Sequence, residues 1–317
     1  MRFCLMIEGQ EGVTWEQWLS LALACEEHGF EALFRSDHYY SVMGARDRGS
    51  SDAWTVLGGL AAATHRVRLG TLVSPVTFRH PTVLAKAATT VDRISGGRAE
   101  LGLGAGWWTE EHETHGFPFP PVPERMEMLA EQLEIVHGLF KEPLFSFEGR
   151  HYTLRDCPFA PKPVQEPHVP VIVGGKGGVG IAGLAARWAD EYNTFFVGPE
   201  EARSRFSRVR DAVDAEDRDQ GSFITSLMTQ VVVGADHAEL IRRVERLMEL
   251  EDARGSPDAY RGEMEGHGAV VGTPDQALER LAAFEEAGVQ RIMLQDLLVD
   301  DLEMLALLGS EVIPRAG

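Results

Sequence analysis

The 317-residue sequence has few cysteines and no long apolar run. Its three cysteines, Cys4, Cys25 and Cys157, show neither CxxC nor zinc-ligand spacing, so no disulfide framework or zinc cluster is expected. No apolar stretch approaches the roughly 18 residues of a membrane helix. Residues 1–7 are predicted to form a strand rather than a signal peptide. We therefore expect a cytoplasmic protein with reduced thiols.

The sequence also lacks an excess of basic residues. Its 49 acidic residues outnumber 30 basic ones, which gives a net charge of -19. Because no Lys/Arg stripe offsets that charge, we expect no binding to nucleic acid or to anionic membranes. The eleven histidines include no HxH pair, and His112 and His115 lack neighbouring ligands, so no metal is expected. These absences leave a small molecule as the expected partner.

Strand-like and helix-like segments alternate along the whole sequence, a pattern typical of parallel α/β folds. The predicted strands cover 1–7, 32–34, 67–72, 99–103, 169–173, 191–195, 224–233 and 291–294. A helix pattern follows each strand, and the first helix begins at a capping box from Thr14 to Gln17. About eight such pairs predict one (β/α)₈ TIM-barrel domain over residues 1–317. An open, doubly wound sheet has the same alternation and stays as the alternative.

Two segments interrupt this alternation. Within residues 143–168, Phe145–Leu154 is predicted as a β-hairpin that turns at Glu148–Arg150, and the prolines that follow exclude a helix. We expect this insertion to lie over one end of the barrel. Residues 251–268 are polar and contain glycines, which predicts a mobile loop.

Residues that follow the strands of such a barrel converge on one mouth, where a site is expected. These residues are Ser36–Tyr39 after the second strand, Ser74–His80 after the third, Gly104–Trp108 after the fourth and Gly174–Gly178 after the fifth. The set combines glycine-rich backbone, two indoles, a histidine beside an aspartate and a lysine. Such groups suit a planar ring that carries a phosphate.

Three of these regions resemble a known family. The stretches Phe34–His38, Arg68–Val73 and Ser95–Trp107 are similar to the luciferase-like monooxygenase superfamily, and Val271–Pro274 before a helix is also typical of it. The combination most resembles the branch that uses coenzyme F420, an 8-hydroxy-5-deazaflavin. The resemblance implies an oxidoreductase with F420 as cofactor. FMN is the alternative, since FMN-using relatives share the barrel and several motifs. We also expect a homodimer.

The resemblance assigns the backbone of Gly104, Ala105 and Gly106 to the pyrimidine edge or linker of the deazaflavin. By itself this segment is also explained as a close strand-to-helix turn. Relatives that oxidise sugar phosphates carry a glutamate directly after this motif, where this sequence has Trp107. That difference argues against a sugar phosphate and favours an apolar or planar substrate.

The segment from Gly174 to Gly178 is the expected phosphate site. Gly174, Gly175, Gly177 and Gly178 allow successive N–H groups to point at one anion, the following helix adds its positive end, and Lys176 adds a charge. A flexible turn is the alternative explanation. The segment is neither a Walker motif nor a dinucleotide-binding motif.

The resemblance places Asp37 and His38 beside the deazaflavin ring. His38 would move a proton near the reacting centre, and Asp37 would fix its tautomer. From the residues alone, His38 is equally a structural hydrogen-bonding group. Leu72-Val73 matches a position where relatives carry a non-prolyl cis peptide behind the ring.

Two further polar groups near the mouth have open roles. Glu110, Glu111 and His112 are predicted on a short helix, either as a solvated face or with Glu110 as a further acid or base. Arg79 either binds a carboxylate or caps the helix that begins at Pro81.

Three functions remain open on the sequence. The first is an F420-dependent oxidoreductase that transfers a hydride to or from a small organic substrate. The second is an FMN-dependent monooxygenase that uses reduced flavin and O₂. The third is a carrier that binds a flavin without turnover.

Overall fold

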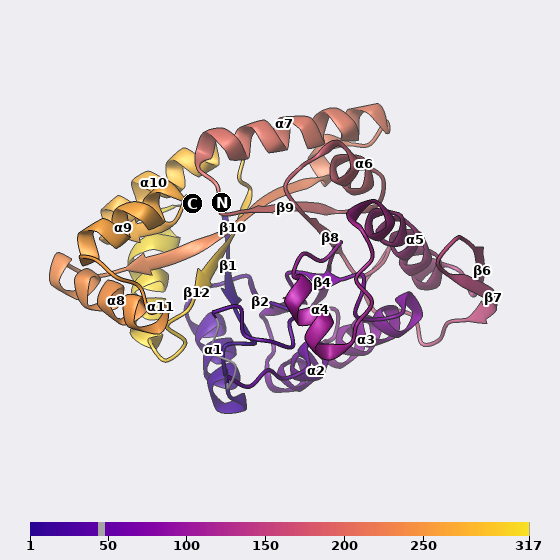
Figure 1. The fold of residues 1–317 in the computed structure, drawn as a ribbon, viewed down its shortest axis with the longest axis horizontal. Helices are drawn as coiled ribbons and strands as arrows, with labels where there is room; N and C mark the ends of the chain where they lie inside the picture. Colours follow the sequence, from indigo (N-terminus) through magenta and orange to yellow (C-terminus); the bar gives the residue numbers. More distant parts are fainter. Residues whose placement is uncertain (44–47, 317) are drawn as a thin grey trace.

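A computed structural model describes residues 1–43 and 48–316 of the chain, and its centre is a closed barrel of eight parallel strands (Figure 1). The strands, in spatial order, are β12 (Arg291–Asp296), β1 (Arg2–Ile7), β2 (Ala32–Arg35), β3 (Arg68–Thr71), β5 (Ala99–Gly104), β8 (Val171–Gly174), β9 (Glu191–Phe195) and β10 (Ile224–Val233). β10 pairs with both β9 and β12, which leaves no free edge in the ring. The predicted (β/α)₈ TIM barrel is confirmed, and the open sheet is excluded.

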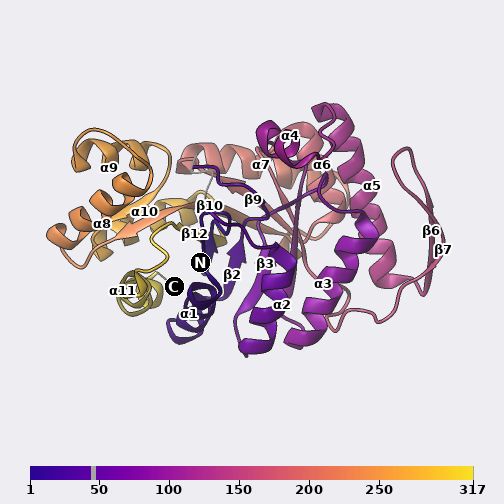
Figure 2. The same ribbon diagram turned by 60° about the horizontal axis from the view of Figure 1, so that its bottom comes forward.

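Helices surround the barrel on its outer side in both views (Figures 1 and 2). They are α1 (Trp15–Glu27), α2 (Ala53–Ala63), α3 (Pro81–Ser95), α5 (Val122–Lys141), α6 (Val179–Trp188), α7 (Pro199–Ala215), α10 (Pro274–Glu286) and α11 (Leu302–Leu307). Short 3₁₀ and π turns lie at Gln220–Ser222, Leu308–Val312 and Ile313–Arg315. The predicted capping box of α1 is present, with Gln17 N–H donating to Thr14 Oγ1 at 3.3 Å. Over residues 1–43 and 48–316, none of the helices has the length and apolar character needed to cross a bilayer.

The predicted hairpin forms from β6 (Leu144–Glu148) and β7 (Thr153–Pro158), but it does not cover an end of the barrel. Both views place it at the outer edge of the molecule beyond α5 (Figures 1 and 2). The backbone N–H groups of its turn donate to the Glu131 carboxylate of α5, that of Arg150 at 2.7 Å. Phe145 packs against Gly138, where any side chain would collide with its ring. The expected position was therefore wrong, because contacts with α5 hold the hairpin against the wall.

The predicted mobile loop at 251–268 is mostly a helix, so that prediction was also wrong. After α8 (His237–Leu250), Ser256 caps α9 (Pro257–Gly266), and β11 (Val270–Gly272) extends the sheet beside the end of β10. These elements share a second hydrophobic core, formed by Val232, Leu240, Val244, Leu247, Met248, Met264, Ala269, Val271 and Leu298. α9 contributes only Met264 as a buried residue, too little apolar periodicity to predict a helix.

Buried charges close the amino end of the barrel. Arg291 of β12 donates to Glu100 of β5 at 2.6 and 2.9 Å and to Glu191 of β9 at 2.9 Å. Arg68 also pairs with Glu100. Ion pairs between side chains of β3, β5, β9 and β12 therefore join the strands at the amino end of the barrel.

Candidate active site

His38 and Glu111 meet at the carboxyl end of the barrel. His38 follows β2, and the short helix α4 (Thr109–His115) brings Glu111 to it. The His38 Nδ1 lies 2.8 Å from Glu111 Oε2, and the Tyr39 N–H donates to Oε1 at 2.6 Å. A carboxylate only accepts hydrogen bonds, so Nδ1 carries a proton and Nε2 is the nitrogen that exchanges one.

The electrostatics of this pair favour the charged imidazole. Burial lowers the pKa of His38, but the hydrogen bond and the charge of Glu111 outweigh burial and raise the pKa above its usual value. The Glu111 side chain is fully buried, while that of His38 keeps 15% of its surface exposed. The ring is therefore held on one side and accessible on the other.

Glu110, the predicted acid or base, lies on the exposed side of α4, whereas Glu111 and His112 point inward. The predicted short helix is confirmed. Its sequence indicated that these acids lie near the mouth but not which side of the helix faces the barrel. The residue of this helix that contacts His38 is Glu111, which the sequence analysis placed on the helix without a specific role.

Asp37 contacts Ser74 and Arg79 rather than His38. The Ser74 hydroxyl donates to its Oδ2 at 2.5 Å, as does the Arg79 guanidinium. Arg79 also binds Asp52 at 2.6 Å and the Tyr39 hydroxyl at 2.9 Å. The carboxylate hydrogen-bonded to the His38 ring is therefore that of Glu111 and not, as expected, that of Asp37.

Arg79 binds carboxylates, and the N-cap of α3 is its neighbour His80, which accepts from the Thr82 N–H at 3.2 Å. Burial raises the pKa of Asp52, but the Thr55 N–H and Arg79 outweigh that effect and lower it to about 2. Arg79 therefore joins the loops after β2 and β3 through ion pairs with Asp37 and Asp52.

The Leu72-Val73 peptide is cis, as the resemblance implied. The Val73 side chain lies beside glycines of β5 and β8. A Cβ on Gly104 would come within 2.7 Å of it, and one on Gly174 within 3.0 Å. These two glycines make room for Val73 at the base of the mouth, a role the sequence did not reveal.

Three aromatic rings stack beside His38. Trp107 and Trp108 lie 5.8 Å apart at 14°, and Tyr40 lies 5.2 Å from Trp108 at 20°. The His38 ring meets Trp107 edge-on at 5.9 Å. Trp107 is 64% exposed, so its outer face is open. Gly106 before it has a φ of 76°, a left-handed conformation that favours glycine at this turn.

The Gly174–Gly178 segment leads into α6, as predicted. Gly177 has a φ of 68° and is buried against the Tyr192 hydroxyl and Arg205, while Lys176 is exposed. No side chain caps the first turn of α6 at Gly178. Exposed N–H groups at a helix start favour an anion, so the arrangement suits a phosphate.

A polar chain crosses the carboxyl ends of β12, β1 and β2, and of its members sequence analysis named only Ser36. Gln295 donates to Glu8 at 2.5 Å, Gln10 donates to the other Glu8 oxygen at 2.8 Å, and Ser36 donates to Gln10 at 2.5 Å. The rule that residues after strands form the mouth, applied to the first and last strands, would have identified them.

Comparisons with known proteins identify the family of this chain. The family described as luciferase-like monooxygenase matches residues 1–291. An F420-dependent glucose-6-phosphate dehydrogenase of Microbacterium testaceum (strain StLB037) is 30% identical, covering 94% of this chain and 92% of that protein. An FMNH₂-dependent dimethylsulfone monooxygenase of Pseudomonas putida is 26% identical, covering 86% of this chain and 80% of that protein.

Among solved structures, the coenzyme F420-dependent tetrahydromethanopterin reductase of Methanopyrus kandleri superimposes with a TM-score of 0.83 at 19% identity. The superposition covers 100% of this chain and 99% of that one, which shows the shared fold. With a family match over most of the sequence, the chain belongs to the luciferase-like monooxygenase family.

Proposed function

We propose that the protein is an F420-dependent oxidoreductase that transfers a hydride to or from a small organic substrate. The observation that carries this proposal is the convergence of three features at one mouth: the His38–Glu111 pair, the Leu72-Val73 cis peptide and the glycine segment before α6. The F420-dependent dehydrogenase that is 30% identical supports the choice of cofactor.

The residues present fit a ring with a phosphate-bearing tail. Gly174–Gly178 and Lys176 would hold the phosphate, because the start of α6 lacks a side-chain cap. Gly104–Gly106 would face the ring, and Val73 would lie behind it. When bound, F420 supplies a carbon that accepts or gives a hydride.

His38 would hold or move the proton that accompanies hydride transfer. Its Nε2 faces away from Glu111, and Glu111 keeps the ring in one tautomer and orientation. Asp37 would help to position the neighbouring residues, since Ser74 and Arg79 both bind its Oδ2. Glu110 would take part only as an exposed proton source at the rim.

The open face of Trp107 favours an apolar or planar substrate. Stacking on an indole stabilises flat rings, and the neighbouring Trp108 and Tyr40 keep that face in place. The same position carries a glutamate in relatives that oxidise sugar phosphates, so we expect no turnover of such phosphates.

The second candidate is an FMN-dependent monooxygenase, which the 26% identical dimethylsulfone enzyme favours. A titration with F420 and FMN side by side separates the two. We expect F420 to bind at least tenfold more tightly, about 1.4 kcal/mol. Equal affinities, or tighter binding of FMN, would reject the F420 assignment.

The titration is sharpened by a variant of the glycine segment. Gly177→Val should weaken F420 binding by about 2 kcal/mol, because a β-branched residue is strained at positive φ. Gly183→Val is the matched control, since Gly183 lies within α6 with open space around it. Far-UV circular dichroism should be unchanged. Unaltered affinity in Gly177→Val would place the phosphate elsewhere.

A further inference from the structure

His112 lies on α4 beside Glu111, and the proposed reaction leaves it without a role. The residue is only 1% exposed, and both of its ring nitrogens have partners. Nδ1 lies 2.7 Å from the Trp108 carbonyl oxygen, and Nε2 lies 2.6 Å from the Thr77 hydroxyl. Because a carbonyl oxygen only accepts, Nδ1 donates to it, and the neutral ring then accepts from the Thr77 hydroxyl at Nε2. Burial lowers the pKa of His112, which favours this neutral form.

The hydrogen bond to Thr77 connects two segments that lie far apart in the sequence. Thr77 follows β4 (Ser74–Pro75), whereas His112 belongs to the helix that follows β5. The His112 ring also packs against the rings of Phe78 and Phe119, with centroid distances of 5.0 and 4.1 Å. The ring of His112 is therefore fixed on both sides, and it links α4 to the loop after β4.

The position of α4 depends on two polar side chains. Of its seven residues, all of which the structure describes, Glu111 and His112 alone are buried, and both are polar. Glu111 contacts the loop after β2 through His38, and His112 contacts the loop after β4 through Thr77. A helix of this length is not stable by itself. The loss of one of these contacts should therefore let α4 move and weaken the other contact.

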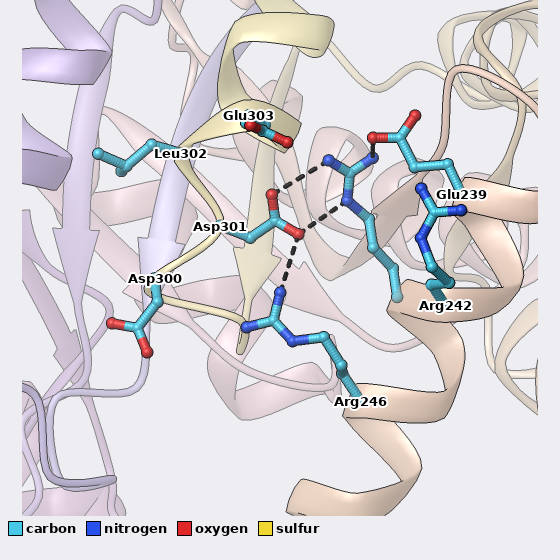
Figure 3. A pocket seen from close by; sticks show the side chains of 8 residues that line it. Glu239, Arg242, Arg246, Asp300, Asp301, Leu302 and Glu303 are labelled. Atoms are coloured by element: carbon cyan, nitrogen blue, oxygen red, sulfur yellow. Dashed lines mark hydrogen bonds and ion pairs between the residues drawn. The ribbon is translucent and has the colours of Figure 1, made fainter.

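α8 shows how a longer helix is held in place. Figure 3 shows Arg246 of α8 directed at Asp301, and the two side chains form an ion pair at 3.2 Å. The helix also packs through an apolar side formed by Leu240, Val244, Leu247 and Met248. The position of α8 therefore does not depend on one polar contact, whereas the described residues of α4 bury no apolar side chain that could replace a lost hydrogen bond.

We propose that His112 is a positioning residue, which holds α4 through Thr77 so that Glu111 stays bonded to His38. The inference rests on the proposed function only for the use of His38 in proton exchange, since the contacts themselves do not involve the cofactor. His112 does not exchange a proton with the substrate, because both of its ring nitrogens are occupied. Without the hydrogen bond to Thr77, Glu111 loses its alignment with His38, and its charge stabilises the imidazolium less.

An NMR titration of the His38 ring in the cofactor-free protein tests the proposal. Thr77→Val removes the hydroxyl donor at nearly constant shape, and His112→Phe keeps a ring but removes both hydrogen bonds. Because the hydrogen bond and the charge of Glu111 raise the pKa of His38, this pKa should fall in both variants. We expect a fall of about 0.5 or more.

Two controls separate this effect from a general disturbance of the barrel. Thr77→Ser keeps the hydroxyl and should retain the pKa that His38 has in the parent protein. Arg246→Met removes a polar contact of α8 and should also leave that pKa unchanged. The charges of Glu8 and Asp37 also raise the pKa of His38, and both residues are intact in every variant.

An unchanged pKa of His38 in folded Thr77→Val and His112→Phe proteins overturns the proposal, with folding followed by far-UV circular dichroism. If His112→Phe does not fold, Thr77→Val decides alone, since Thr77 is only partly buried. Because the titration uses no F420, a failure of the F420 assignment leaves this test intact, and an unchanged pKa leaves the F420 assignment intact.

Turnover gives a second readout for Thr77→Val. A misaligned Glu111 should lower kcat about 10–100-fold with little change in KM, because catalytic groups lose efficiency when they are displaced. A higher KM at unchanged kcat would show that the Thr77–His112 contact serves substrate binding instead, and would overturn the proposal.

Discussion

The two ends of the barrel both bury carboxylates against cations, but with different cations. At the amino end, Arg291 is 2% exposed and binds Glu100 and Glu191. At the carboxyl end, buried Glu111 binds His38, which keeps a solvent-facing side. Arginine does not lose its proton in proteins, whereas histidine titrates near neutral pH. The two buried acids of the amino end therefore hold the barrel strands together, whereas Glu111 holds the His38 ring for which we propose proton exchange.

The pKa values of the two buried acids at the amino end, Glu100 and Glu191, are shifted in opposite directions. Burial raises the pKa of Glu100, but the charges of Arg291 and Arg68 outweigh it and lower the value to about 2. Burial raises the pKa of Glu191, and the charge of Glu100 adds to the effect despite Arg291. Glu100 receives two bonds from Arg291 and one from Arg68, while Glu191 receives one from Arg291. Removing Arg291 would thus leave two acids without their main cation.

The largest expected effect is on stability at the amino end. Arg291→Met should reduce the free energy of unfolding by about 3–5 kcal/mol, because it leaves buried carboxylates unpaired. Urea unfolding measures the loss. The control Arg315→Met removes the exposed pair with Asp275 and should cost less than about 1 kcal/mol. Equal losses in the two variants would show that the amino-end ion pairs do not stabilise the barrel.

The next effect is on turnover at the carboxyl end. His38→Asn keeps a polar side chain of similar shape but removes proton exchange near neutral pH. Turnover should fall about 10²–10⁴-fold, with a much smaller loss of cofactor affinity. Single-turnover hydride transfer is the measurement, and His65→Asn, at an exposed position, is the control. A rate within a few-fold of the parent would limit His38 to positioning.

The smallest effect distinguishes Glu111 from Glu110. The charge of Glu111 stabilises the imidazolium, so Glu111→Gln should lower the pKa of His38 and move the acid limb of the rate profile to lower pH. Glu110→Gln should change neither the pKa of His38 nor the acid limb of the rate profile. An NMR titration of the His38 ring gives the pKa in each variant. If the pKa of His38 shifts in Glu110→Gln but not in Glu111→Gln, Glu110 is the carboxylate that acts on His38.

Local sequence patterns predicted most of the elements and the rim of the site. Residues 251–268 were missed because α9 buries one apolar side chain and depends on the α8 core for its packing. The hairpin was recognised, but its position depends on Glu131 and Gly138 of α5, which are distant in sequence.

By itself, the sequence determined the eightfold alternation, the caps and turns, and which residues follow each strand, because these depend on neighbours a few positions apart. Only the tertiary structure decided that Glu111 rather than Glu110 meets His38, and that Arg79 forms an ion pair with Asp37. Each of these contacts joins loops from different strands. Closure of the barrel and the packing of α4 set which side chains face each other there, and no local pattern records that geometry.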